Sequence, residues 1–128
     1  MQKIFNKTGD KKAANWLKKS TGFIKEKNWD EVLRCAQIAA DLDPGQKRAY
    51  YNISLAYYNK NKLKDALFYI NRALLLDSNF GYALNLKGQV LEKLGYLNKA
   101  LKFYEKGCAI DFKEACENHK RLFYLLKK

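Results

Sequence analysis

Cysteine and histidine are the residues of this 128-residue chain that could support redox, nucleophilic or metal chemistry. There are three cysteines, Cys35, Cys108 and Cys116, and one histidine, His119. Cys116 and His119 form a single pair at helical spacing, whereas a structural zinc site takes four ligands. An odd number of cysteines without a framework spacing is typical of reduced thiols that serve as small core residues. We therefore predict free thiols and no bound metal.

No combination of residues in the sequence indicates catalysis. His119 has no serine or cysteine partner in a nucleophile motif, and the sequence contains no glycine-rich phosphate loop. Its carboxylates do not occur as a pair in a pocket-like setting. These observations predict a protein that is not an enzyme and that needs no cofactor.

The chain is strongly basic. It contains 25 Lys and Arg against 13 Asp and Glu, a formal net charge of +12. Such a charge attracts phosphate groups in a salt-dependent way, so non-specific binding of nucleic acid is one interpretation. However, lysine dominates over arginine, and no segment combines a dense basic stripe with base-stacking aromatic residues. Nucleic-acid binding is therefore kept as the alternative function.

The sequence gives no sign of a membrane span or a secretion signal. No apolar run approaches the roughly 20 residues that cross a bilayer as a helix. The N-terminal stretch MQKIFNKTGDKK lacks the apolar centre of a signal peptide. We therefore predict a cytoplasmic protein without a transmembrane segment.

The sequence repeats itself at intervals of 34 residues. The stretch Leu63–Asp77 returns as Leu97–Asp111 and is preceded by a similar copy, Trp29–Asp43. Apolar residues within the copies recur at i, i+3, i+4 and i+7, which is typical of amphipathic helices. Asn61 and Gly95 lie between two such stripes and favour the left-handed turn that ends a helix. The sequence therefore predicts an all-α array of stacked helical hairpins.

An aspartate ends each copy. Asp43, Asp77 and Asp111 stand where a helix is expected to finish, and a negative charge is unfavourable there. We expect these side chains to accept hydrogen bonds from the backbone of the connection that follows.

The 34-residue copies place small and large residues at fixed positions. These residues are Trp16, Ser20, Phe23, Trp29, Ala39 and Pro44 in the first copy, Tyr50, Ser54, Tyr57, Leu63, Ala66 and Ala73 in the second, and Leu84, Gly88, Leu91, Gly95, Leu97, Ala100, Tyr104 and Gly107 in the third. A 34-residue helical hairpin with this pattern resembles the tetratricopeptide repeat family. Val32 and Ala36 depart from the pattern in the first copy. The resemblance implies a right-handed superhelix of three repeats with a C-terminal capping helix, acting as a protein–protein interaction module or scaffold.

The resemblance also divides the chain into five segments. These are an N-terminal tail or the end of a preceding helix (1–12), three repeats (13–46, 47–80 and 81–114) and the capping helix (115–128). The second alternative for residues 1–12 applies if the chain is a fragment of a longer array.

The capping helix is expected to cover the last repeat. Ala115, Leu122, Leu125 and Leu126 form one apolar stripe. The neighbouring Phe123 and Tyr124 fall outside that stripe, which makes them candidates for self-association into a homo-oligomer. The alternative is that these two aromatic side chains are partly packed within one chain.

In the family the first helix of each repeat faces a concave groove, and the groove positions carry over to this chain. They hold Lys18, Thr21, Lys25, Arg48, Tyr51, Asn52, Leu55, Tyr58, Tyr82, Asn85, Leu86, Gln89 and Lys93. Tyrosine suits an interface hot spot, amides pair with a peptide backbone, and lysines favour an acidic ligand. The resemblance thus implies a groove for an acidic peptide or helix of a partner protein. The alternative is that the tyrosines pack on one another and line a solvated groove.

One subclass of the family does not fit this sequence. Members that grip the acidic C-terminal tails of heat-shock chaperones use lysine, asparagine and arginine at five groove positions. Those positions hold Leu17, Thr21, Asn52, Tyr82 and Leu86, of which only Asn52 agrees. We therefore do not expect a clamp for chaperone tails.

Overall fold

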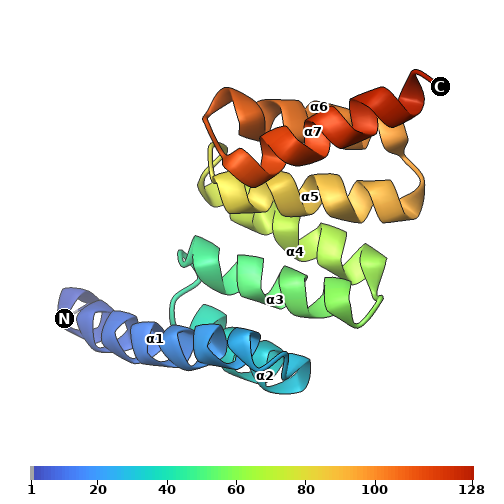
Figure 1. Cartoon of the computed structure of the whole chain (residues 1–128). Helices are drawn as coiled ribbons and strands as arrows, with labels where there is room; N and C mark the ends of the chain where they lie inside the picture. Colours follow the sequence, from blue (N-terminus) through green and yellow to red (C-terminus); the bar gives the residue numbers. More distant parts are fainter. Residues whose placement is uncertain (1) are drawn as a thin grey trace.

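The structure is a computed structural model that describes residues 2–128, with side chains from Lys11 onward. Over that range the fold is all-α, as predicted. The helices are α1 (Gln2–Lys25), α2 (Trp29–Leu42), α3 (Lys47–Asn59), α4 (Leu63–Leu76), α5 (Gly81–Leu94), α6 (Leu97–Ala109) and α7 (Lys113–Leu126). They stack in chain order, from α1 and α2 at one end to α7 at the other (Figure 1).

The helices form an inner and an outer layer. Each odd-numbered helix packs on the even-numbered helix that follows it, and it also contacts the next odd-numbered helix. In contrast, over the described residues no Cα atom of α4 lies within 8 Å of α2 or of α6. The array therefore curves, with α1, α3, α5 and α7 on the inner side and α2, α4 and α6 spread apart on the outer side.

The hairpin turns adopt the left-handed conformation that the sequence predicted. Asn61 has φ 61° and Gly95 has φ 90°. Lys27, which occupies the corresponding turn of the first hairpin, also has positive φ (56°) although it is neither glycine nor asparagine. The first hairpin thus makes the same turn with a less suitable residue.

The aspartate prediction is confirmed for two of the three residues. Asp43 Oδ1 accepts a hydrogen bond from Gly45 N (3.0 Å), and Asp77 Oδ1 accepts one from Asn79 N (3.0 Å). Asp111 differs because α6 ends at Ala109, which places Asp111 in the turn itself at φ 64°. There its own N–H donates to the carbonyl of Cys108 (2.9 Å).

Small residues allow the two helices of each hairpin to approach closely. Ser20 Oγ donates to the carbonyl of Val32 (2.9 Å), and 34 residues later Ser54 Oγ donates to that of Ala66 (2.7 Å). The third hairpin has Gly88 at this place, and a Cβ atom there would lie 2.4 Å from the ring of Tyr104. Only glycine leaves room for a buried tyrosine at this crossing.

Both ends of the chain differ from the sequence expectations. The expected N-terminal tail, or end of a preceding helix, is neither, because residues 2–12 form the first turns of α1 itself. The last helix begins at Lys113, two residues before the expected boundary, because Phe112 is the extended residue that precedes it.

The prediction of an apolar stripe on the capping helix is correct for two of its four residues. Ala115 and Leu122 are fully buried, whereas Leu125 and Leu126 are 56% and 40% exposed. Leu122 packs in a cluster with Leu91, Ala100 and Tyr104, and the last turn of α7 extends past this cluster. The capping face therefore ends at Leu122.

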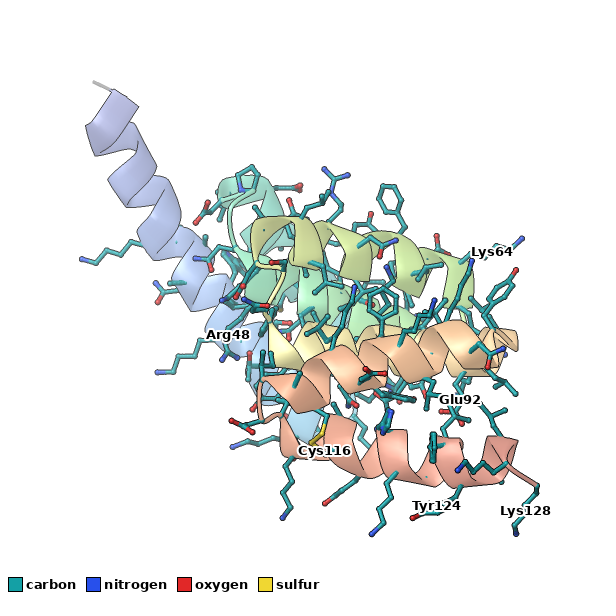
Figure 2. The ribbon with its side chains drawn as sticks, turned by 90° about the horizontal axis from the view of Figure 1, so that it is seen from above. Arg48, Lys64, Glu92, Cys116, Tyr124 and Lys128 are labelled. Carbon is teal, nitrogen blue, oxygen red and sulfur yellow. A yellow bond between two sulfur atoms is a disulfide. The ribbon has the colours of Figure 1, made fainter. Side chains whose placement is uncertain are left out.

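The prediction of reduced cysteines is wrong for two of the three. Cys35 is a buried free thiol, but Cys108 and Cys116 form a disulfide between α6 and α7 (Figure 2). The turn between these helices brings the two Cα atoms to 4.5 Å, which is within bonding range. The disulfide thus fastens the capping helix to the last repeat.

Among residues 2–128, none of the helices combines the length and the hydropathy required to cross a membrane.

We predict that Gly88→Ala lowers the free energy of unfolding by about 1–3 kcal/mol, because the added methyl group overpacks the contact with Tyr104. Gly22→Ala is the matched control, since nothing lies within 4 Å of a Cβ atom there. It should be neutral, or stabilising by up to ~1 kcal/mol through helix propensity. Urea denaturation followed by circular dichroism measures both, and equal effects would contradict the packing argument.

Candidate functional site

The inner side of the array carries the residues that the sequence analysis assigned to a groove. Lys18, Thr21, Lys25, Arg48, Tyr82 and Lys93 are exposed, and Tyr51, Leu55, Tyr58, Asn85 and Gln89 are half-buried. Asn52 and Leu86 are buried. We use the term inner face for the exposed and half-buried members of this set.

Four aromatic rings gather where α3, α5 and α7 meet on the inner face. We define Tyr51, Phe80, Tyr82 and Phe112 as the aromatic cluster. Ring centroids lie 5.7 Å apart for Tyr51–Phe80 and Tyr51–Tyr82, and 4.8 Å apart for Tyr82–Phe112. Burial, reinforced by the neighbouring Tyr82 hydroxyl, raises the pKa of Tyr51 to about 12. Tyr82 is 49% exposed, so the aromatic cluster reaches the surface of the inner face.

The guanidinium of Arg48 lies over the aromatic cluster. Its Cζ atom is 5.8 Å from the Tyr82 ring centroid and 6.0 Å from that of Phe80. An arginine that stacks on aromatic rings keeps its N–H groups available for hydrogen bonds in the plane of the guanidinium.

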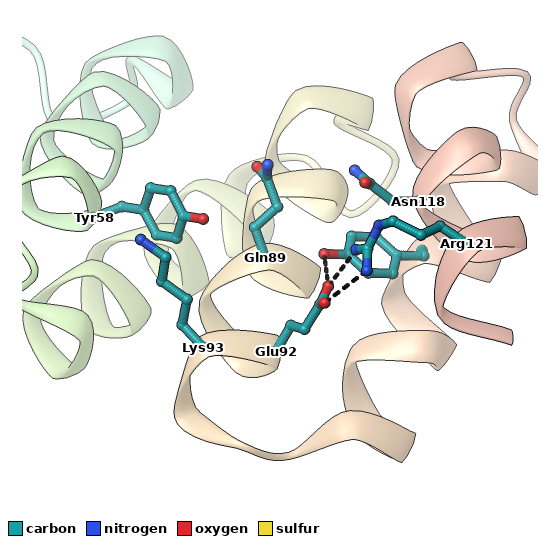
Figure 3. A pocket seen from close by; sticks show the side chains of 7 residues that line it. Tyr58, Gln89, Glu92, Lys93, Asn118 and Arg121 are labelled. Carbon is teal, nitrogen blue, oxygen red and sulfur yellow. Dashed lines mark hydrogen bonds and ion pairs between the residues drawn. The ribbon is translucent and has the colours of Figure 1, made fainter. Parts of the chain in front are cut away.

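A pocket of about 280 Å³ lies at the α7 end of the inner face (Figure 3). Its lining consists of Tyr58, Gln89, Glu92, Lys93, Tyr104, Asn118 and Arg121. Glu92 accepts hydrogen bonds from both terminal nitrogens of Arg121 (2.6 and 2.9 Å) and from the Tyr104 hydroxyl (2.8 Å). This network connects α5, α6 and α7.

The network shifts the acidity of its members. The hydrogen bond from Arg121 lowers the pKa of Glu92 below its usual range, and the same contact raises the pKa of Arg121. Burial, followed by the hydrogen bond to Glu92, raises the pKa of Tyr104. The carboxylate of Glu92 is therefore ionised and already compensated by Arg121.

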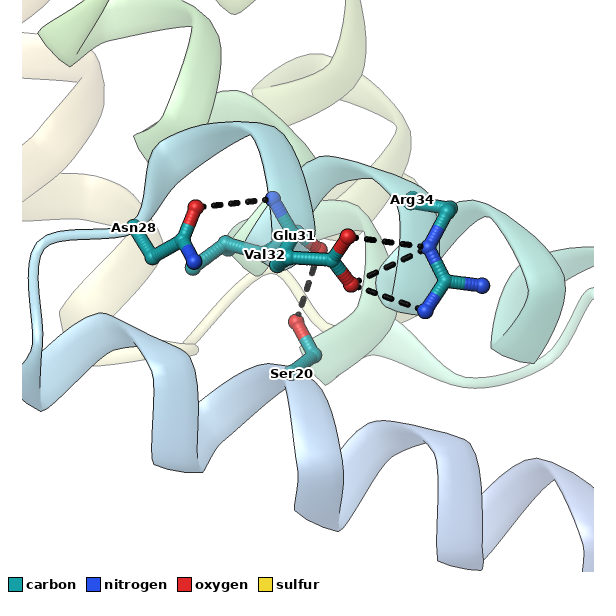
Figure 4. Close-up of polar contacts among 5 residues, drawn as sticks. All are labelled: Ser20, Asn28, Glu31, Val32 and Arg34. Atoms are coloured by element: carbon teal, nitrogen blue, oxygen red, sulfur yellow. Dashed lines mark hydrogen bonds and ion pairs between the residues drawn. The ribbon is translucent and has the colours of Figure 1, made fainter.

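Two of the predicted groove residues are not accessible to a partner. Asn52 is 4% exposed, and its Nδ2 donates to Ser20 Oγ (3.2 Å) and Thr21 Oγ1 (3.3 Å). Ser20 in turn donates to the Val32 carbonyl (Figure 4), so the amide is used between α1 and α3. Leu86 is 1% exposed because it belongs to the hydrophobic core. Asn52 and Leu86 are thus structural residues.

The cations of the inner face lack acidic partners. Within residues 11–128, no carboxylate oxygen lies within 4.0 Å of the charged groups of Lys18, Lys25, Arg48 or Lys93. Lys93 instead lies over the Tyr58 ring, with Nζ 4.3 Å from its centroid. The inner face therefore carries uncompensated positive charge beside exposed aromatic surface.

Sequence reasoning missed several residues of this site. Phe80 and Phe112 each stand directly before an inner helix, a recurrence that could have been noticed. Asn118 and Arg121 are at i and i+3 on α7, a helix for which the sequence predicts only a capping role. Asn118 donates a hydrogen bond to Asn85 Oδ1 on the inner face (2.9 Å). Within the described residues, no three His, Cys, Asp or Glu side chains are grouped to hold a metal.

Comparison with known families identifies the repeats. Two models described as tetratricopeptide repeat match residues 47–80 and 81–114, which together make up just over half of the chain.

Comparison with solved structures finds the same fold. The first repeat domain of Spaghetti (RPAP3) bound to the HSP90 peptide SRMEEVD is 24% identical, with a TM-score of 0.85 over 93% of this chain and 96% of that chain. The domain of Arabidopsis OM64 is 19% identical, with a TM-score of 0.85 over 91% and 98%. The second domain of human RPAP3 in complex with the HSP70 peptide SGPTIEEVD is 21% identical, with a TM-score of 0.78 over 91% and 97%.

We predict that the Glu92–Arg121 contact stabilises the protein at neutral pH and loses this effect in acid. Because the folded pKa of Glu92 is lowered, the contribution is complete above the ordinary glutamate pKa of about 4.3 and disappears as the pH falls through the folded value. The free energy of unfolding of Glu92→Gln should therefore approach that of the wild type between about pH 5 and pH 2. A difference that stays constant over this range would contradict the prediction. Asp30 and Asp77, whose pKa values are also lowered, titrate equally in both proteins.

Proposed function

The chain belongs to the tetratricopeptide repeat family, and from this premise we propose that it is a non-enzymatic adaptor whose inner face binds an acidic segment of a partner protein. In this proposal the repeats are residues 13–46, 47–80 and 81–114, and 115–128 form the cap. The observation that carries the proposal is the set of cations on the inner face without a carboxylate within 4.0 Å among residues 11–128.

The charge of the inner face favours an acidic ligand. Lys18, Lys25, Arg48 and Lys93 come from α1, α3 and α5, so an extended segment along the inner side would meet positive charge from one helix after another. Glu92, on the same side, is compensated by Arg121 and does not repel such a ligand strongly. Complementary charge of this kind increases the rate of association and sets the register.

The aromatic cluster supplies the apolar part of the interface. Tyr82 combines exposed area with rigid neighbours in Tyr51 and Phe112, and interface hot spots are enriched in such anchors. Arg48, stacked over Tyr82, can present its N–H groups to a carboxylate next to the ring. Together they suit a ligand with an acidic residue beside an apolar one.

The proposed ligand is an acidic segment in general. Two of the similar structures, the first domain of Spaghetti (RPAP3) and the second domain of human RPAP3, carry peptides that end in EEVD, and this supports a protein partner. However, the five positions that correspond to the chaperone-tail clamp hold Leu17, Thr21, Asn52, Tyr82 and Leu86. Only Asn52 agrees with the clamp, and it is buried. We therefore do not propose chaperone tails as the ligand.

We predict that Arg48→Ala with Tyr82→Ala weakens partner binding by 2 kcal/mol or more, about 30-fold, if the pair forms a hot spot. The proposed location is the cytoplasm, so the measurement is affinity capture from the cytosolic fraction of the source cells, with and without nuclease. Tyr96→Ala, another exposed tyrosine (54%) outside the inner face, is the matched control. A partner retained by the double variant contradicts the proposal, and material that disappears with nuclease favours the nucleic-acid alternative.

Phe123 and Tyr124 remain the proposed self-association surface, since they are 37% and 59% exposed at the free end of α7. We expect wild-type protein to form a homo-oligomer that Phe123→Ala with Tyr124→Ser abolishes. Sedimentation velocity measures this directly. The same sedimentation coefficient for both proteins would contradict the expectation.

A further inference from the structure

The outer helix α4 carries an exposed apolar stripe in addition to its buried one. Ala66, Ile70 and Ala73 are fully buried against the rest of the array. Phe68, Leu75 and Leu76 are 55%, 87% and 47% exposed, and with Arg72 they follow the spacing i, i+4, i+7 and i+8. That spacing makes one continuous face of a helix, and it is the pattern of a helix that packs on a neighbour.

This stripe, formed by Phe68, Arg72, Leu75 and Leu76, borders a groove on the outer side of the array. No Cα atom of α2 lies within 8 Å of α4, so the inner helix α3 forms the floor between them through Tyr50 and Ile53. One pocket of about 560 Å³ lies between α2 and α4, and a second of about 460 Å³ adjoins it along α4; the two share Pro44, Tyr50, Phe68 and Arg72. We name this feature the α2–α4 groove.

Two polar groups in the α2–α4 groove have unused hydrogen-bonding capacity. The Arg72 guanidinium lies over the rings of Tyr50 (5.6 Å) and Phe68 (5.4 Å), and among residues 11–128 no carboxylate oxygen is within 4.0 Å of its nitrogens. Asn71 Oδ1 is buried and has no hydrogen-bond donor in the described part of the chain. Asp41, on the α2 wall, is the carboxylate that lines the groove, but it does not pair with Arg72.

We propose that the α2–α4 groove binds an amphipathic helix of a partner protein. The apolar residues of that helix pack on Phe68, Leu75 and Leu76, and one of its carboxylates pairs with the Arg72 guanidinium. A helix supplies side chains at the same i, i+4, i+7 spacing as α4 itself, so the two stripes interdigitate over about two turns.

Charge decides between a partner protein and a second copy of this chain. A second copy could offer two exposed apolar segments: the end of α7, where Leu125 and Leu126 are followed directly by Lys127 and Lys128, and the α4 stripe itself, which carries Arg72. Docking either segment would bring further positive charge to Arg72. An acidic amphipathic helix has the complementary charge.

The α2–α4 groove and the inner face lie on opposite layers of the array, so this proposal does not depend on the function proposed for the inner face. A partner could occupy either surface, or one surface while a second partner occupies the other.

The test uses a displayed library of helical 16-residue peptides, selected on the full wild-type chain and then measured one by one. There are two groove variants: the single variant Arg72→Glu, and the double variant Phe68→Ser with Leu75→Ser. Because these side chains are exposed, the fold should persist in both variants, and circular dichroism verifies this. Tyr96→Ser is the control for loss of an exposed aromatic side chain elsewhere. The double variant Arg48→Ala with Tyr82→Ala removes the two side chains proposed as the hot spot of the inner face.

We expect selected peptides with apolar residues at helical spacing beside Asp or Glu. Their affinity should fall at least tenfold with either groove variant and stay unchanged with Tyr96→Ser and with Arg48→Ala/Tyr82→Ala. When the Asp or Glu of the peptide is changed to Lys, the affinity for the Arg72→Glu variant should recover. The proposal would be overturned if every selected peptide bound the groove variants as well as it binds the wild type. So would sedimentation showing that Phe68→Ser with Leu75→Ser dissociates a wild-type dimer, because the occupant would then be a second copy.

Discussion

The fold depends on the close approach of two helices within each hairpin. Ser20, Ser54 and Gly88 stand at the crossing, 34 residues apart, and each keeps the partner helix near. The serines satisfy a carbonyl of the opposite helix, while Gly88 makes room for the Tyr104 ring. Because these contacts fix the pitch of every hairpin, the odd-numbered helices meet along the inner side and the even-numbered helices separate along the outer side.

This curvature produces two surfaces of different character. On the inner side the helices are close enough for side chains to bridge them, so Asn52 reaches Ser20 and the rings of the aromatic cluster touch. The result is a shallow, positively charged wall with Tyr82 as its exposed anchor. On the outer side α2 and α4 are separated, and Tyr50 and Ile53 of α3 line the floor of the α2–α4 groove.

The helices and their turns could be predicted because they depend on residues close in sequence. The apolar period of α4 and the left-handed turn at Asn61 are examples of such local signals. The burial of Asn52 could not be predicted, because it is decided by Ser20, 32 positions away on another helix. Leu86 likewise is buried in a core cluster to which several helices contribute. The Cys108–Cys116 disulfide depends on the angle between α6 and α7, which the cysteine spacing does not define. A periodic sequence therefore specifies its helices well and its interhelical contacts poorly.

The arginines show how the same residue type is divided between stability and recognition. The chain has four: Arg34 pairs with Glu31 and Arg121 with Glu92, so both are used within the fold. Arg48 and Arg72 have no such partner among residues 11–128, and each lies over two aromatic rings. Stacking holds a guanidinium in place without consuming its N–H groups, which then suit a carboxylate that approaches from outside. Since Arg48 belongs to the inner face and Arg72 to the α2–α4 groove, each surface has one preorganised site for an acidic group.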